Sequence, residues 1–164
     1  MYETIVWATD GSGGADAALA EARRLAELTG ARILAVHCDQ RMTGRAGAWS
    51  VLPDEDDRRG RIRREVEAAR HEGVPIDLVV VPSRRSPAET VTAVAAERDA
   101  QLIVCSTRGR RAVAAAALGS FTHRILRLAP CPVVVVPVLP ARRRSPSLRG
   151  RREAGPIPVE AMTT

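Results

Sequence analysis

The sequence predicts an α/β fold in which five parallel strands form an open sheet with helices on both faces. Short runs of β-branched and aliphatic residues alternate with segments whose apolar residues recur at helical spacing, a pattern typical of parallel sheets with right-handed crossovers. The expected strands are 4–8, 32–38, 76–81, 102–105 and 133–136. The expected helices are 16–28, 57–71, 86–99 and 121–128.

Local signals support individual elements. Gly30 follows the first helical segment, where a glycine commonly ends a helix. Ser86, Pro87 and Glu89 have the spacing of a capping box with proline in the first turn, which predicts the start of the third helix. Residues 40–57 are polar and contain glycine and proline, and we expect them to form a loop.

Composition indicates one domain followed by a tail. The 164 residues suit a single core, which we assign to residues 1–140. Residues 141–164 are rich in Arg, Ser and Pro without apolar periodicity, and we expect a disordered Arg-rich tail. This tail holds six arginines and two glutamates, so about +4 of the net charge of +6 belongs to it. A nearly neutral domain is not typical of specific nucleic-acid binding.

Neither a membrane span nor a signal peptide is evident, and the expected location is cytoplasmic. The three cysteines, Cys38, Cys105 and Cys131, are far apart and lack metal-ligand spacing, so we expect them to be structural.

Small residues stand where two expected strands end. Residues 10–12, Asp-Gly-Ser, follow the first strand, and residues 106–109, Ser-Thr-Arg-Gly, follow the fourth. After nine intervening residues, Gly119 and Ser120 stand at the start of the last helix. Small residues at a strand-to-helix junction let helix N-terminal amides bind an anion, so the spacing predicts a phosphate site. If the first and fourth strands are neighbours, both segments face one crevice.

Each of these features also has a structural interpretation. Asp10 is either a ligand contact or only a turn residue, and Arg108 either binds phosphate or belongs to a solvated basic loop. His37 lies between apolar neighbours and is expected to be structural. The chain has no Lys, no evident Ser-His-Asp arrangement and no paired carboxylates at strand ends, so we expect it not to be an enzyme.

Over nearly all of residues 1–138, the sequence resembles the universal stress protein family, in particular its nucleotide-binding members. Those members carry the motif Gly-x-x-Gly, which is followed after nine residues by Gly-Ser or Gly-Thr. In this chain Gly109, Gly119 and Ser120 match the motif in register, and Ser106 stands in place of the first glycine. The resemblance extends to residues 8–12 after the first strand, 35–38 at the end of the second and 129–133 before the last.

The resemblance implies a Rossmann-like, adenine nucleotide alpha hydrolase-like fold and a regulatory role in the stress response. It implies binding of ATP, with AMP and ADP as alternatives, and leaves a requirement for Mg²⁺ open. The implied nucleotide-binding residues are Ala8, Thr9, Asp10, Cys38, Ser106, Arg108, Gly109, Gly119, Ser120 and Phe121. The resemblance places the Asp10 region and the Cys38 backbone beside the adenine, the Gly109 turn near the ribose and phosphates, and Gly119 and Ser120 at the phosphates. It also implies a homodimer formed through the last strand.

Ser106 departs from the family pattern and supports a second hypothesis. If this backbone position requires a positive φ, serine costs about 1 kcal/mol there; if only close approach is needed, serine fits. The alternative is therefore a nucleotide-free dimeric interaction module on the same fold.

Overall fold

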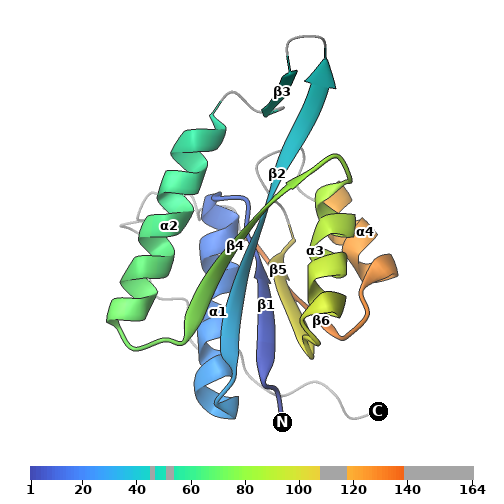
Figure 1. Ribbon diagram of the computed structural model, residues 1–164. Coiled ribbons are helices and arrows are strands. Elements are labelled where there is room, and N and C mark those ends of the chain that lie inside the picture. Colours follow the sequence, from blue (N-terminus) through green and yellow to red (C-terminus); the bar gives the residue numbers. More distant parts are fainter. Residues whose placement is uncertain (45–46, 51–53, 108–117, 139–164) are drawn as a thin grey trace, which may run out of the picture.

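A computed structural model describes residues 1–44, 47–50, 54–107 and 118–138, which form one sheet with helices on both sides (Figure 1). The strands are β1 (Thr4–Ala8), β2 (Arg32–Gly44), β3 (Gly47–Ser50), β4 (Ile76–Ser83), β5 (Leu102–Ser106) and β6 (Val133–Val136). The helices are α1 (Gly13–Thr29), α2 (Glu55–His71), α3 (Pro87–Glu97) and α4 (Ser120–Leu128). The predicted tail, residues 141–164, lies outside the described residues.

Five of the described strands are parallel, in the order β4-β2-β1-β5-β6, which confirms the predicted open parallel sheet. β1 lies in the centre, with Val6 opposite Leu34 of β2 on one side and Ile103 of β5 on the other. The first and fourth parallel strands are therefore neighbours. The strand order reverses between them, and their carboxyl ends form the switch point where such sheets bind ligands.

The prediction of a loop over residues 40–57 is wrong. β2 continues to Gly44 and forms an antiparallel hairpin with β3, in which Met42 lies opposite Trp49. The hairpin projects from the body of the molecule (Figure 1). Strand formation depends strongly on pairing. Here β4 pairs with β2 as far as Gln40, and β3 pairs with β2 from Arg41 onward. The composition of residues 40–57 alone does not indicate the pairing of β2 with β3. α2 accordingly begins at Glu55, two residues earlier than expected.

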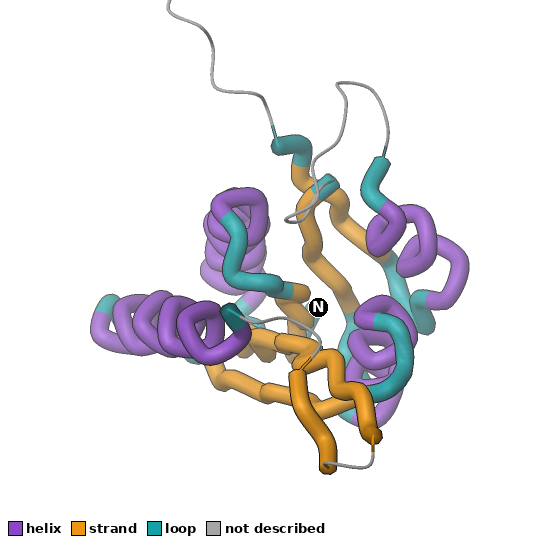
Figure 2. Tube along the Cα trace, turned by 90° about the horizontal axis from the view of Figure 1, so that it is seen from above, coloured by secondary structure: helices purple, strands orange, loops and turns teal. Residues whose placement is uncertain are grey.

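Two apolar cores hold the helices against the sheet, one on each face (Figure 2). Alternation along β1 supplies both, because Trp7 points toward α1 and α2 while Val6 points toward α3 and α4. Ile62 of α2 completes the first core, and Val91 of α3 and Ile125 of α4 complete the second. Trp7 also donates its indole N–H to the carbonyl of Ala15, 3.1 Å away.

No helix among the described residues is both long and apolar enough to cross a membrane.

Candidate functional site

A pocket of about 140 Å³ opens at the carboxyl ends of β1, β2 and β5. Its apolar walls come mainly from α3 and α4, and its polar side chains come from the strand ends and α2. The lining residues are Ala8, Thr9, Asp10, Val36, His37, Cys38, Gln40, Arg58, Pro87, Val91, Cys105, Ser106 and Phe121. A mostly apolar pocket with a few convergent polar groups at a switch point is the usual form of a ligand site.

The turn after β1 presents Asp10 at the pocket. The N–H of Thr9 donates to the carbonyl of Val36 (3.0 Å), which ties the start of the turn to β2. Oγ1 of Thr9 accepts the N–H of Gly11 (3.2 Å), and Oδ1 of Asp10 accepts the N–H of Ser12 (3.0 Å). Asp10 therefore belongs to the turn and to the pocket at once, so its two sequence-based interpretations are compatible.

The opposite side of the pocket joins the end of β5 to the start of α4. Gly119 donates its N–H to the carbonyl of Thr107 (2.9 Å). The buried hydroxyl of Thr122 donates to the carbonyl of Ser106 (2.9 Å). These bonds hold the first turn of α4 beside the end of β5, and Phe121 of that turn lines the pocket.

Ser106 fits this junction without backbone strain. Among the described non-glycine residues only Asp99 has a positive φ, so Ser106 does not occupy the left-handed region. Its side chain is buried at the end of β5. The energetic cost attached to a serine at this position therefore does not arise in this conformation.

The N-termini of α3 and α4 differ in whether a side chain accepts hydrogen bonds from their first backbone amides. Ser86 and Glu89 form the predicted capping box at α3, with the Ser86 hydroxyl accepting the Glu89 N–H (3.3 Å) and the Glu89 carboxylate accepting the Ser86 N–H (2.9 Å). α4 begins after Gly119, and no side chain caps it among the described residues. Its first-turn amides and helix dipole are therefore suited to an anionic group.

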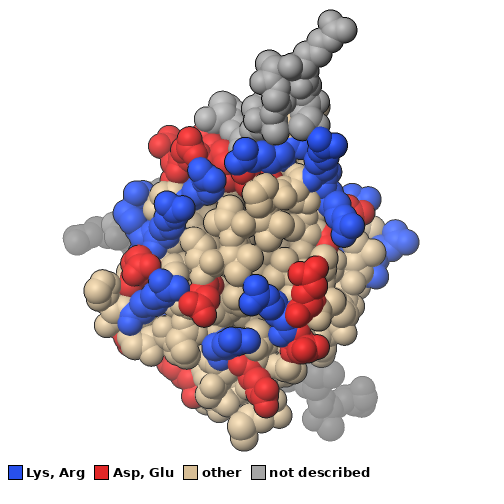
Figure 3. All heavy atoms as spheres, in the orientation of Figure 1, with Lys and Arg blue, Asp and Glu red and all other residues tan. Residues whose placement is uncertain are grey.

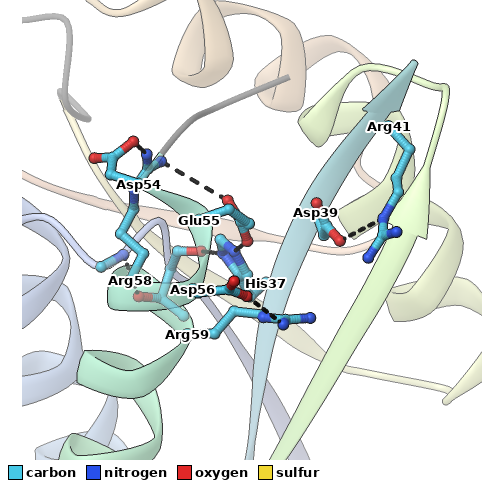
Figure 4. A network of polar contacts seen from close by, with 10 residues as sticks. His37, Asp39, Arg41, Asp54, Glu55, Asp56, Arg58 and Arg59 are labelled. Atoms are coloured by element: carbon cyan, nitrogen blue, oxygen red, sulfur yellow. Dashed lines mark hydrogen bonds and ion pairs between the residues drawn. The ribbon is translucent and has the colours of Figure 1, made fainter. Parts of the chain in front are cut away.

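The first turn of α2 forms a polar network with His37 of β2 (Figure 4), and two of its members, His37 and Arg58, line the pocket. Nδ1 of His37 lies 3.0 Å from the carbonyl oxygen of Thr9, and Nε2 of His37 lies 2.5 Å from Oε1 of Glu55. Arg58 forms an ion pair with Asp54, and its Nη1 lies 3.9 Å from Oε2 of Glu55. His37, Glu55 and Arg58 are all buried. The expected structural role of His37 agrees with these contacts.

Two thiols line the pocket, and neither is activated. Burial raises the pKa of the Cys105 thiol to about 11. Burial also raises the pKa of Cys38; a hydrogen bond with Thr90 opposes this, and the charges of Asp39 and Glu55 add to it. Both thiols are therefore protonated near neutral pH, and a protonated thiol is a poor nucleophile.

The structure brings together residues from all the predicted segments that it describes. Six predicted residues line the pocket: Ala8, Thr9, Asp10, Cys38, Ser106 and Phe121. Gly119 and Ser120 lie at the start of α4, immediately before Phe121. Arg108 and Gly109 lie outside the described residues.

Several pocket residues were absent from the sequence-based prediction. Val36 and Gln40 share one face of β2 with Cys38, so strand alternation would have found them. Pro87 and Val91, a helical turn apart on α3, follow from the third helix packing near the switch point. Arg58 carries no local signal, because an arginine among many in an amphipathic helix is normally a surface residue.

Within the ranges that the structure describes, no three His, Cys, Asp or Glu side chains come together as a metal site would require.

The comparisons with known proteins agree on one family. The universal stress protein family model matches residues 1–137. A curated protein of Thermus aquaticus, described as "universal stress protein in QAH/OAS sulfhydrylase 3'region", is 36% identical over 139 residues, covering 83% of this chain and 99% of the relative.

Solved structures share the fold. The universal stress protein of Archaeoglobus fulgidus superposes with a TM-score of 0.67 at 24% identity, over 83% of this chain and 99% of that one. A universal stress protein in complex with cAMP superposes with a TM-score of 0.65 at 24% identity, over 82% and 97%. An Archaeoglobus fulgidus member in complex with dAMP gives 0.63 at 22%, over 83% and 98%. The family model spans nearly the whole described chain, and the curated relative is matched almost end to end. This chain belongs to the universal stress protein family.

Proposed function

We propose that this protein binds an adenine nucleotide, with ATP as its ligand, and acts as a regulatory protein of the stress response. The observation that carries the proposal is the pairing of an apolar pocket with an uncapped helix N-terminus at the switch point of the sheet. The complexes of two structural neighbours with cAMP and dAMP support the same ligand class.

The residues present fit such a ligand. A planar base suits a pocket with apolar lining residues such as Val36, Val91 and Phe121, and Asp10 can accept hydrogen bonds from hydroxyl or amino groups. The first turn of α4, which follows Gly119, can hold phosphate oxygens by its amides. Binding at the first turn of α4 would then alter contacts with a partner.

We further propose that the protein binds its nucleotide without using it as a substrate. Rapid phosphoryl transfer needs dense positive charge and metal ligands at the phosphates, and a chain without lysine lacks one common source of that charge. A cytoplasmic homodimer completes the proposal. A nucleic-acid ligand is not part of it, because acidic and basic side chains are intermingled over the face shown in Figure 3.

Thermal unfolding with and without nucleotide tests the proposal. At one hundred times the dissociation constant, a ligand specific for the folded state adds about 2.7 kcal/mol, which corresponds to roughly 5 to 10 °C in Tm. ATP, AMP, cAMP and GTP are compared, each with and without Mg²⁺. A shift with the adenine nucleotides and little with GTP is expected.

Gly119→Val locates the site. A branched side chain at the start of α4 would obstruct the phosphates, so this variant should keep the Tm of the free protein and lose the shift. Gly60→Val is the matched control, because a β-carbon at Gly60 meets only the flexible end of Arg64, at 3.6 Å. Absence of any shift in the unaltered protein would support the nucleotide-free interaction module instead.

A further inference from the structure

His37 is held between two acceptors. Its Nδ1 faces the carbonyl oxygen of Thr9 at 3.0 Å, and its Nε2 faces Oε1 of Glu55 at 2.5 Å. Both His37 and Glu55 are more than nine-tenths buried. Figure 4 shows the ring of His37 lying between the strand and the first turn of α2.

The chemistry of these contacts fixes where the protons lie. A carbonyl oxygen only accepts, so Nδ1 of His37 carries a hydrogen and donates it to Thr9. One further proton lies between Nε2 and Glu55, held either by the ring or by the carboxyl group. Without Glu55 the ring would lose the partner of Nε2 that helps to hold this orientation.

Thr9 connects His37 to the pocket. The residue accepts from His37 through its carbonyl and holds the turn through its hydroxyl, which accepts the N–H of Gly11. Asp10, the next residue, lines the pocket. The ring of His37 therefore acts on the backbone immediately before a predicted ligand contact.

α2 reaches the same turn at a second point. Arg58, one helical turn after Glu55, lines the pocket and packs against Gly11. Its Nη1 lies 3.9 Å from Oε2 of Glu55, an oxygen that is buried and finds no hydrogen-bond partner among the described residues. The orientation of the Glu55 carboxyl group is thus set by two contacts. His37 lies against one of its oxygens, and the charge of Arg58 lies near the other.

We propose that Glu55 is a positioning residue for the pocket: through His37 it fixes the Thr9–Asp10 turn, so the first turn of α2 sets the affinity for nucleotide. Glu55 does so without lining the pocket. This inference rests on the proposed function. A partner or a sequence change that acts on the first turn of α2 could therefore tune binding.

Two substitutions at one position separate positioning from simple stability. Glu55→Gln keeps a side chain whose amide can donate to Nε2, so His37 retains its Nδ1–H and its bond to Thr9. Glu55→Met keeps the length but offers no polar partner. Asp56→Asn is the control, because Asp56 is an exposed neighbour in the same turn that pairs with Arg59 at 2.7 Å.

The affinity for ATP is measured by titration calorimetry, together with the Tm of each free variant. Glu55→Met should weaken binding about tenfold, the effect of losing one hydrogen bond that involves a charged group, while Glu55→Gln and Asp56→Asn stay within about threefold of the unaltered protein. Nitrogen-15 spectra of the imidazoles give an independent readout, and the chain has only three histidines. A slowly exchanging Nδ1–H signal of His37 is expected in the unaltered protein and in Glu55→Gln, and its loss in Glu55→Met.

The outcomes distinguish the two proposals. If the unaltered protein binds ATP and Glu55→Met binds it equally well, the positioning role is overturned and the proposed function stands. If no adenine nucleotide binds the unaltered protein, the proposed function fails and this inference fails with it. Should Glu55→Met not fold, His37→Asn breaks the same link and is expected to show the same loss; unchanged affinity in that variant overturns the inference.

Discussion

Gly11, in the turn after β1, packs so closely on α2 that a β-carbon added to it would lie 3.3 Å from Cγ of Arg58. The φ angle of Gly11 is +69°, in the left-handed region that residues with side chains rarely adopt. The backbone conformation thus favours glycine at this position, next to Asp10, and the packing against Arg58 leaves little room for a β-carbon.

Gly11→Ala should therefore lower the free energy of unfolding by about 1 to 2 kcal/mol, from the left-handed conformation alone. Urea denaturation monitored by circular dichroism measures the change. Gly13→Ala is the matched control, because a β-carbon at Gly13 meets nothing within 4 Å, and its stability should be equal or slightly higher. Equal losses in both variants would show that the turn does not depend on the conformation of Gly11.

Alkaline pH should destabilise the protein through Cys105. Burial raises the pKa of this thiol to about 11 in the folded state, whereas an unfolded thiol titrates near 8.5. Because the pKa of the thiol is higher in the folded state than in the unfolded state, folding is favoured while the thiol stays protonated in both. This contribution to the free energy of unfolding is fully present below the unfolded pKa and is lost as pH rises toward 11. Between pH 7.5 and 10.5 the loss from Cys105 is about 2.5 kcal/mol.

Urea midpoints at these two pH values, for the unaltered protein and Cys105→Ala, test this effect. The chain has no lysine and only one tyrosine, so few other groups titrate in this window. Burial raises the pKa of Cys38 and Cys131 as well, so Cys105→Ala should reduce the pH dependence without abolishing it. The same pH dependence in both proteins would contradict the assignment to Cys105.

The open edge of β6 should form the dimer. β6 is half-buried and lies at the end of the described sheet, with Val134 opposite Val104 of β5. The carbonyl of Pro132 accepts from Ile103 of β5 and that of Val136 from Thr107, just after β5. The alternate residues, Val133 and Val135, therefore present their backbone groups to the outside. A twofold copy of the strand would satisfy those groups.

Val135→Pro removes one outward N–H and should shift the protein from dimer to monomer in sedimentation velocity at micromolar concentration. Val135→Ala keeps the N–H and should remain dimeric. A monomeric unaltered protein would exclude this interface at that concentration.

The Arg-rich segment after the domain should be dispensable. Residues 141–164 hold few large apolar side chains, and ordering them would cost about 1 to 2 kcal/mol per residue in backbone entropy. A chain that ends at Pro140 should keep the Tm and the nucleotide-induced shift of the full chain. A destabilisation above about 1 kcal/mol would mean that the segment packs on the domain and that the predicted boundary is misplaced.

Local patterns were sufficient for the elements that build the sheet. Apolar runs located the five parallel strands, and the capping box of Ser86 and Glu89 located the start of α3. Gly30 ends α1 in the left-handed conformation expected of it, with its N–H donating to the carbonyl of Ala26. These features depend on residues close together in the chain, so they could be predicted from the local sequence alone.

Part of the candidate site could be predicted from the sequence for the same reason. Asp10 and Ser106 each follow an apolar strand, and the rule that ligands bind at a switch point placed them together once β1 and β5 were taken as neighbours. Cys38 followed from the family resemblance, and strand alternation from it would have added Gln40.

By itself, the sequence determined the order of strands and helices, their main caps and the strand ends that carry the pocket, because these depend on short-range periodicity and backbone preference. Only the tertiary structure decided that β2 continues into a hairpin and that two residues of a charged helix are buried, Glu55 against His37 and Arg58 at the pocket. The physical reason is that a strand needs a partner and a buried charge needs a counter-charge or hydrogen bond. Two of those partners, β3 for the strand and His37 for Glu55, become neighbours only when the chain has folded. Asp54 pairs with Arg58 from four residues away in the chain.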